Sequence, residues 1–243
     1  MGKRILVQRK GRGNQWARSP SHRHVGEVKY RPFLNKEKQF KFKVIELIHA
    51  PGRGAPVAKI QYQDNNSKSL WLPPEGIYEG QEFLQHRTGH GQDISVGYVL
   101  PLKKIPLGTI VCNIEGTPQD GGKFARASGV GALVRNKSED KVELLFRSKK
   151  TKWFNNKCLC TVGVVAGGGR TDKPFLKAGN KHYYVRSKAK KWPVVRGCTM
   201  NACSHPYGGG AKQSPHKSTT TSRNAPPGRK IGQIAARRTG YQN

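Results

Sequence analysis

The last third of the chain, residues 171–243, contains 15 Lys and Arg residues and a single acidic residue, Asp172. These charges lie among Gly, Pro, Ser and Thr residues, without the apolar period of a helix or strand that buries one face. A segment of this composition cannot bury a core, and its charges repel one another until a polyanion neutralises them. The sequence therefore predicts that this segment takes its shape from a bound polyanion.

The net charge of +31 is concentrated at the two ends of the chain. Residues 1–43 contain 13 Lys and Arg against two acids, whereas residues 44–170 contain 17 against 11. Surfaces that are merely kept soluble by charge intersperse acidic and basic residues. The segregation therefore favours a globular body that carries nucleic-acid-binding extensions, and RNA is the polyanion that we expect.

A membrane is not expected as a partner. No apolar run approaches the roughly 20 residues that cross a bilayer, and the N-terminus lacks the apolar region of a secretory signal. The Gly- and Pro-broken ends show no basic amphipathic helix of the kind that lies on a membrane surface. The five cysteines are odd in number, which suits a reducing compartment. We therefore expect a cytosolic protein.

Short runs of strand character fill residues 40–165, and none of this region sustains an amphipathic helical pattern. The first group of expected strands is 40–48, 57–62, 70–72, 81–86 and 94–99. After a junction at 101–108, the second group is 109–114, 132–135, 142–146, 151–154 and 159–165. The pattern predicts an all-β body of two small barrels, for which the oligonucleotide-binding type is one solution for the first. The segment at 11–24 has neither period and is expected to be an extended arm.

Several motifs follow one another in a specific order along the chain. They occupy residues 17–23, 73–76, 105–109, 120–129, 167–174, 192–197, 200–202, 205–210 and 222–230. In this order they closely resemble the universal large-subunit ribosomal protein L2 family. The Ser-Arg-Asn-Ala-Pro-Pro-Gly run at 222–228 is similar to the archaeal and eukaryotic branch of the family.

The resemblance implies an oligonucleotide-binding-fold barrel followed by an SH3-like barrel, with both basic ends threaded into rRNA. We expect an N-terminal arm at 1–39, the first barrel at 40–100, the second at 101–170 and a C-terminal extension at 171–243. Members of the family are primary rRNA binders in the cytoplasmic large subunit that support its assembly, subunit association, tRNA placement and the peptidyl-transferase region. Other ribosomal proteins and the small subunit are implied as neighbours. A free RNA chaperone or regulator with the same barrels is the alternative.

The expected RNA contacts combine cations with glycine-rich turns. Adjacent glycines at 121–122 and 167–169 let the backbone approach a phosphate closely. Phe124 either stacks on a base or fills the barrel, and the two alternatives stay open. The full set of expected RNA-binding residues is Arg9, Lys10, Arg12, Arg18, Ser21, His22, Arg23, Lys123, Arg126, Gly167, Gly168, Gly169, Arg170, Lys173, Lys177, Lys181, Arg196, Asn201, His205, Gly208, Gly209, Gly210, Arg223, Arg229, Lys230, Arg237 and Arg238.

His205 is the strongest candidate for a chemical role, because a neutral imidazole donates or accepts a hydrogen bond near neutral pH. The resemblance implies a histidine that has been discussed as assisting peptide-bond formation. General-base catalysis would require this ring to reach the reacting amine, and no neighbouring acid in the sequence orients it. We therefore favour placement against RNA and expect no catalytic residue. Bacterial relatives often have a second histidine at the position of Tyr207.

The sequence gives little support for a nucleoside triphosphatase or for an enzyme with a cysteine nucleophile. The glycine run before Arg170 lacks the Gly-Lys-Ser/Thr ending of a nucleotide-binding loop. Cys203 and His205 are two residues apart, with no oxyanion-hole pattern. No small-molecule substrate is expected, and no cofactor beyond the Mg or K ions that rRNA carries.

The cysteines and tryptophans divide between core and surface. The spacings of Cys158, Cys160, Cys198 and Cys203 differ from those of zinc ribbons, and Cys160 is expected to be a buried strand thiol, so we expect no metal site. Cys112 is the fifth cysteine. Among the tryptophans, Trp71 and Trp153 are expected in the core, whereas Trp16 and Trp192 lie among cations and are expected to stack on bases.

Overall fold

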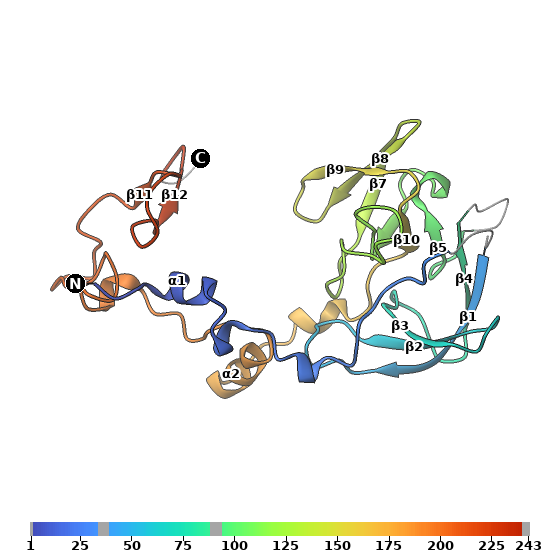
Figure 1. The fold of residues 1–243 in the computed structure, drawn as a ribbon, viewed down its shortest axis with the longest axis horizontal. Coiled ribbons are helices and arrows are strands. Elements are labelled where there is room, and N and C mark those ends of the chain that lie inside the picture. The colour runs from blue at the N-terminus through green and yellow to red at the C-terminus, as the bar shows by residue number, and fades with distance from the viewer. Residues whose placement is uncertain (1, 34–38, 88–93, 240–243) are drawn as a thin grey trace. The chain divides into compact units, whose positions relative to one another are not determined.

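A computed structural model of the chain describes residues 2–33, 39–87 and 94–239. The chain forms two compact units (Figure 1). The first, here called the body, is Ser21–Phe175, and the second, here called the terminal unit, joins Met1–Pro20 to Leu176–Asn243. Residues 1–20 of the basic N-terminal end and nearly all of the basic C-terminal end therefore belong to one unit and not to two independent arms.

The body is built on a single sheet of ten strands among the described residues. Its order is β3-β2-β1-β4-β5-β10-β6-β7-β8-β9. The strands are β1 (Gln39–Ile48), β2 (Val57–Tyr62), β3 (Lys68–Trp71), β4 (Glu82–His86), β5 (Val99–Pro101), β6 (Ile110–Cys112), β7 (Ala132–Lys137), β8 (Lys141–Phe146), β9 (Thr151–Asn155) and β10 (Leu159–Val162). The all-β prediction for the body is confirmed.

The first half of the sheet closes over an aromatic core. Along β1, Phe40, Phe42 and Val44 are buried while the lysines between them are exposed, which is the period-two pattern of a half-buried strand. β1 pairs antiparallel with β2, as expected, and also with β4. The Phe42 ring lies 5.3 Å from the Trp71 ring in an edge-on contact. Burial of Trp71 confirms its expected place in the core.

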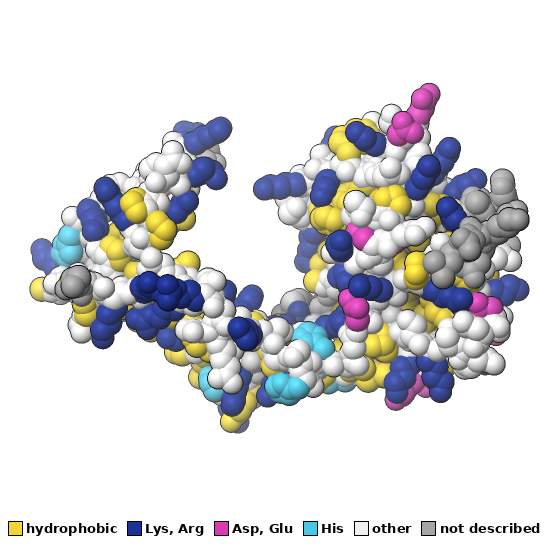
Figure 2. Space-filling model, in the orientation of Figure 1, with side chains coloured by type: hydrophobic (Ala, Val, Ile, Leu, Met, Phe, Trp, Pro, Cys, Tyr) yellow, Lys and Arg dark blue, Asp and Glu magenta, His cyan; other side chains and the backbone are white. Residues whose placement is uncertain are grey.

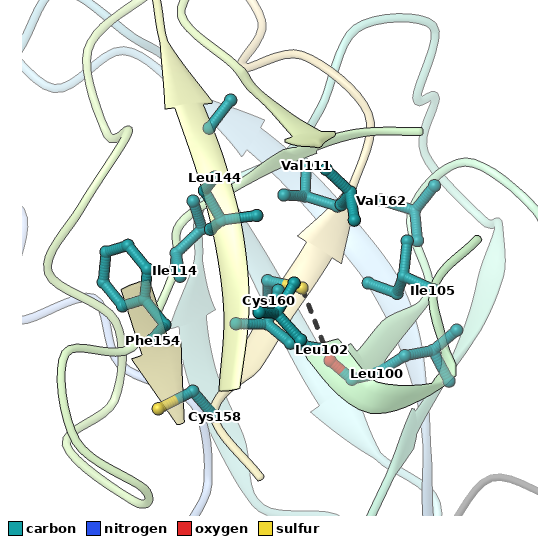
Figure 3. Close-up of a cluster of buried hydrophobic side chains, with 13 residues drawn as sticks. Leu100, Leu102, Ile105, Val111, Ile114, Leu144, Phe154, Cys158, Cys160 and Val162 are labelled. Carbon is teal, nitrogen blue, oxygen red and sulfur yellow. Dashed lines mark hydrogen bonds between the residues drawn. The ribbon is translucent and has the colours of Figure 1, made fainter. Parts of the chain in front are cut away.

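The second half of the sheet encloses a mainly aliphatic core (Figure 3). Its labelled members include Leu102, Ile105, Ile114 and Leu144, all fully buried. Cys160 on β10 is fully buried as well, and its Sγ donates to the Leu100 carbonyl oxygen at 3.5 Å. The interpretation of Cys160 as a strand thiol is therefore confirmed. The predicted junction at 101–108 is not a bare linker, because it supplies Leu102 and Ile105 to this core.

The two halves meet at β5 and β10. Val99 belongs to the first core, whereas Leu100, the next residue on β5, belongs to the second. β10 pairs with both β5 and β6, and its Leu159 reaches back into the first core. On the N-terminal side, residues 28–33 pack into the body through Val28, Tyr30 and Phe33. The four domain limits expected from the sequence stay a prediction.

Several details of the sequence prediction are wrong. Of the run 94–99, only Val99 lies in a strand, and β10 ends at Val162 and not at residue 165. Trp153 is 47% exposed and so is not a core residue. Its strand, β9, is the last in the sheet order, and Phe154 takes the inward position because successive side chains alternate between faces.

The terminal unit contains little regular structure. Its α-helices are α1 (Leu6–Gly11) and α2 (Ala178–Arg186), and its strands are β11 (Thr220–Thr221) and β12 (Gln233–Ile234), which pair in parallel. The backbone N–H of Lys3 donates to the Cys203 carbonyl at 2.6 Å, so the two ends of the chain associate directly. The segment at 11–24, expected to be an extended arm, contains short 3₁₀ turns at Gln15–Ala17 and Ser21–Arg23. No helix in the described part of the chain is long and apolar enough to span a bilayer.

Candidate nucleic-acid interface

The terminal unit contains no acidic side chain. Residues 1–20 and 176–243 hold 20 Lys and Arg residues and no Asp or Glu, whereas residues 21–175 hold 25 against all 14 acids of the chain. Figure 2 shows Lys and Arg side chains over the terminal unit, with the visible Asp and Glu side chains on the body. No acidic side chain of this unit can neutralise its cations, so the charge is left for an external polyanion.

The cations predicted in the terminal unit are all exposed. They are Arg9, Lys10, Arg12, Arg18, Lys177, Lys181, Arg196, Arg223, Arg229, Lys230, Arg237 and Arg238. Three of them contact neutral groups: Arg9 donates to the Arg4 carbonyl at 2.9 Å, Arg196 donates to Gln213 Oε1 at 2.6 Å, and the Lys181 ammonium lies 5.6 Å from the Trp192 ring. Such contacts orient the cations without cancelling their charge.

In the body, two of the predicted glycine motifs come together. Gly129, at the end of the 120–129 motif, has a φ of 68°, and a side chain there would meet the backbone of Gly168. Arg170, at the end of the 167–170 motif, donates from Nε to Ser128 Oγ at 3.3 Å. Arg170 and Lys173 are exposed, as are Ser21, His22 and Arg23. The fold thus places two motifs about 40 residues apart in sequence against each other.

Arg126 and a residue that the sequence analysis missed, Arg53, line one cavity of the body. Arg126 donates to the carbonyls of Gly122 and Val28 at 2.8 and 2.7 Å, and Arg53 donates to the Gly26 carbonyl at 2.8 Å. The cavity, of about 410 Å³, is lined by His24, Glu27, Val28, Lys29, Arg53 and Arg126. Arg53 lies in a Pro-Gly-Arg-Gly turn that carries no periodic signal, so only the fold reveals its place.

The two guanidinium groups are held by backbone carbonyls and not by carboxylates. Burial lowers the pKa of both arginines, and the nearby Arg126 charge lowers the pKa of Arg53 further. Glu27 forms an ion pair with Lys29 at 2.7 Å, which leaves an excess of positive charge around the cavity. A concave site of this kind suits a phosphate, the group that arginine recognises with paired hydrogen bonds.

Phe124 is partly buried and packs against the second core. Its ring makes an edge-on contact with the Phe154 ring at 5.1 Å, and the Lys152 ammonium lies 4.2 Å from its centre. Of the two alternatives for this residue, the structure supports the core position. The neighbouring Lys123 is exposed and lies 3.3 Å from an oxygen of Asp120.

Two carboxyl groups hold the loop that carries these residues. The fully buried Glu115 accepts hydrogen bonds from the backbone N–H groups of Gln119, Gly121 and Leu159 at 2.8–3.1 Å. Asp120 accepts from the N–H groups of residues 116, 117 and 122. Burial raises the pKa of Glu115 despite these donors, whereas at Asp120 the donors and Lys123 outweigh burial and lower the pKa. The glycine loop is therefore rigidly fastened to the body.

Glu115→Gln is expected to lower the free energy of unfolding by about 1–3 kcal/mol, because a glutamine amide has only one oxygen and its NH₂ group would face a backbone N–H donor. The measurement is denaturant unfolding of the full chain followed by tryptophan fluorescence. Glu82→Gln on β4, an exposed residue, removes the same charge as a control and is expected to change little. Equal effects from the two substitutions would contradict the anchoring role.

His205 is held by the backbone of its own segment. Its Nδ1 accepts the Tyr207 backbone N–H at 3.1 Å, and its ring lies edge-on to the Tyr207 ring at 5.2 Å. Burial, with the Lys217 charge as a second cause, lowers the pKa of His205. The imidazole is therefore neutral at neutral pH, with its proton on Nε2. The ring also packs beside Gly197, where an added side chain would collide with it. The position of the ring is therefore fixed, and Nε2–H is its hydrogen-bond donor.

The glycines after His205 are needed by the segment's own packing. The Gly208 N–H donates to the His205 carbonyl at 2.9 Å, and the Gly209 N–H donates to the Met200 carbonyl at 3.0 Å. A side chain at Gly208 would meet the carbonyl oxygens of Met200 and Asn201. The Asn201 carbonyl also accepts from the N–H of His205 at 3.3 Å. The segment therefore folds into a compact set of turns. Asn201 and Gly210 are exposed on its outer side.

The cysteines divide by unit. Cys112, Cys158 and Cys160 are buried in the body, and burial raises the pKa of Cys112 and Cys158 to about 12. Cys198 is half-buried and Cys203 is exposed in the terminal unit. Within the described residues, no cluster of three or more His, Cys, Asp or Glu side chains is placed to hold a metal ion.

Comparison with known proteins agrees with this architecture. The family described as "Ribosomal Proteins L2, RNA binding N-terminal domain" matches residues 3–85, and "Ribosomal Proteins L2, C-terminal domain" matches residues 95–229. The chain belongs to the ribosomal protein L2 family. Its all-β body is accordingly an oligonucleotide-binding-fold barrel followed by an SH3-like barrel, as predicted.

Similar full-length relatives come from archaea. The chain is 48% identical over 240 residues to the large ribosomal subunit protein uL2 of Korarchaeum cryptofilum, covering 99% of this chain and 96% of the relative. It is 48% identical over 242 residues to uL2 of Methanopyrus kandleri and 47% identical over 240 residues to uL2 of Haloarcula marismortui, with 99% of this chain and 98% of each relative covered. The archaeal character suggested by the 222–228 run agrees with these relatives.

Proposed function

We propose that the chain is a structural constituent of the large ribosomal subunit, where it binds rRNA as a scaffold and not as an enzyme. The observation that carries the proposal is the terminal unit, an 88-residue fold with 20 basic and no acidic side chains, in a chain of the L2 family. Such a unit is stable next to a polyanion, because each phosphate contact neutralises a cation and releases a counterion.

The terminal unit and the body contact rRNA in different ways. The exposed cations of the terminal unit lie along rRNA phosphates, while the Arg53–Arg126 cavity and the glycine loops dock the body on folded rRNA. Specificity comes from the shape of the folded RNA more than from base edges. The fixed Nε2–H of His205 donates to RNA. The proposal extends to subunit association, tRNA placement and support of the peptidyl-transferase region, with other ribosomal proteins and the small subunit as neighbours, in the cytoplasm.

Deletion of residues 197–243 is expected to abolish cosedimentation of the chain with large subunits while leaving the body folded. The deleted segment contributes seven of the cations of the terminal unit but none of the residues of the two body cores. The measurement is sucrose-gradient sedimentation of tagged chains from cells that also contain the untagged protein. The circular dichroism of the purified variant checks that its β-structure is retained.

The full-length chain provides the control for this experiment. It is expected in stoichiometric amounts with large subunits, and a pool bound mainly to other RNAs would support the chaperone alternative. If the truncated chain sedimented with large subunits as the full-length chain does, the role assigned to the C-terminal segment would be wrong.

A further inference from the structure

The terminal unit contains a small cavity, and of its lining residues only Arg229 is among the expected RNA contacts. It encloses about 380 Å³ beside strand β11 and the turn that follows it. Its lining includes Tyr207, Lys217, Thr220, Asn224, Arg229 and Ile231. The volume lies within the range of about 300–1,000 Å³ found for small-ligand sites and is far too small for a helix of RNA.

The cavity is built from contacts between distant residues of the unit. The Tyr207 hydroxyl donates to the Thr219 carbonyl at 3.4 Å, and Thr221 Oγ1 donates to the Ile231 carbonyl at 2.8 Å. A side chain at Gly232, whose φ is 79°, would collide with the Tyr207 hydroxyl. β11 and β12 pair beside the cavity through Thr220 and Gln233. The aromatic wall therefore has a defined position.

The chemistry of the lining matches one class of ligand. Tyr207 provides an aromatic surface for stacking, the Asn224 amide both donates and accepts hydrogen bonds, and Lys217 and Arg229 supply positive charge. The Lys217 ammonium lies 5.7 Å from the Tyr207 ring, so the cation and the aromatic surface occupy one side of the site. No acidic residue is present in the lining. An aromatic ring, an amide and cations together suit a nucleotide, which has a flat base and an anionic phosphate.

We propose that this cavity binds a single unpaired nucleotide of rRNA, with its base on Tyr207, its base edge at Asn224 and its phosphate near Lys217 and Arg229. The inference rests on the proposed function, because it takes rRNA as the source of the nucleotide. A duplex cannot enter the cavity, so the nucleotide is one that is turned out of its stack, a common way for proteins to read RNA.

The first test locates the contact. The full chain is bound to an archaeal large-subunit rRNA transcript, irradiated at short wavelength to form zero-length crosslinks, and digested with protease and nuclease. Mass spectrometry is expected to find one nucleotide on a peptide that contains Tyr207, at a single rRNA position. Crosslinks from this peptide to many positions, or to none, would overturn the inference, as would a crosslink to another protein in assembled subunits.

The second test measures affinity. Tyr207→Ala is expected to weaken rRNA binding by about 5- to 150-fold, the loss that removal of one base-stacking side chain causes. Its salt dependence should stay unchanged, because no charge is removed. Tyr207→Phe keeps the stacking surface and is expected to bind within about twofold of the original chain. Tyr183→Ala on α2, an exposed aromatic residue outside the cavity, is the matched control and is expected to have no effect.

The two proposals fail in different ways. If the unaltered chain does not bind the rRNA, the proposed function fails. If it binds but Tyr207→Ala matches the Tyr183→Ala control, only the nucleotide site fails. Free adenosine, cytidine, guanosine and uridine monophosphates are also titrated into the chain without rRNA. Saturable binding of one of them that Tyr207→Ala removes would assign the cavity to a free nucleotide and overturn the rRNA source.

Discussion

Raising the monovalent salt from 50 to 200 mM is expected to weaken binding of the chain to large-subunit rRNA by about 10³- to 10⁵-fold. This decrease corresponds to about six to ten phosphate contacts, a fraction of the 20 cations in the terminal unit. Those cations have no acidic side chain in their own unit, so added salt weakens their attraction to RNA without breaking an ion pair inside the unit. Filter binding or fluorescence anisotropy over a salt series gives the slope of log affinity against log salt.

A charge-removing variant tests which cations contribute. Replacing Arg223, Arg237 and Arg238 by Gln is expected to reduce the slope by about two to three, because each phosphate that is no longer neutralised lowers it by close to one. Replacing the same residues by Lys keeps the charge and is the matched control, so its slope should stay close to that of the original chain. A slope that is unchanged in the Gln variant would show that these three residues do not bind phosphate.

Trp71→Ala is expected to lower the free energy of unfolding of the body by about 3–5 kcal/mol. The Trp71 side chain is 2% exposed and contacts the rings of Phe42 and Phe83 at 5.3 and 5.4 Å. Its removal leaves a cavity in a core of other rings that cannot collapse fully. Chemical denaturation followed by circular dichroism, with the terminal unit present, measures the change.

Trp153→Ala is the matched control, because it removes the same side chain from the same sheet. Trp153 is 47% exposed on the edge strand β9, so a change of at most about 1 kcal/mol is expected. Comparable destabilisation by the two substitutions would mean that the ring core around Trp71 does not stabilise the body as the packing indicates.

These two tryptophans show which structural features can be predicted from the sequence and which cannot. Both lie in short runs of strand character, and the structure places both in strands. Burial depends also on which strands become neighbours, and this is a long-range property. Trp71 faces the first core, whereas Trp153 alternates with the inward-facing Phe154 on the outermost strand. Local pattern cannot distinguish the two positions, because the face that is covered is decided by pairing elsewhere in the chain.

In the candidate interface, too, some features follow from the sequence and others only from the fold. The cations and the glycine motifs are evident from composition and order, because charge segregation needs no fold to be seen. Arg53 has no such signal, and its place beside Arg126 depends on three segments that meet only in the folded body. Phe124 and Gly208 likewise take their roles from packing, in the second core and against the Met200 and Asn201 carbonyls.

By itself, the sequence determined that the chain has an all-β body and basic ends suited to a polyanion, since side-chain period and net charge are local properties. The tertiary structure decided that both ends join in one acid-free unit, that the two barrels share one sheet, and which aromatic and arginine side chains face a core or a cavity. These features depend on contacts between residues far apart in the chain, and no local pattern records such contacts.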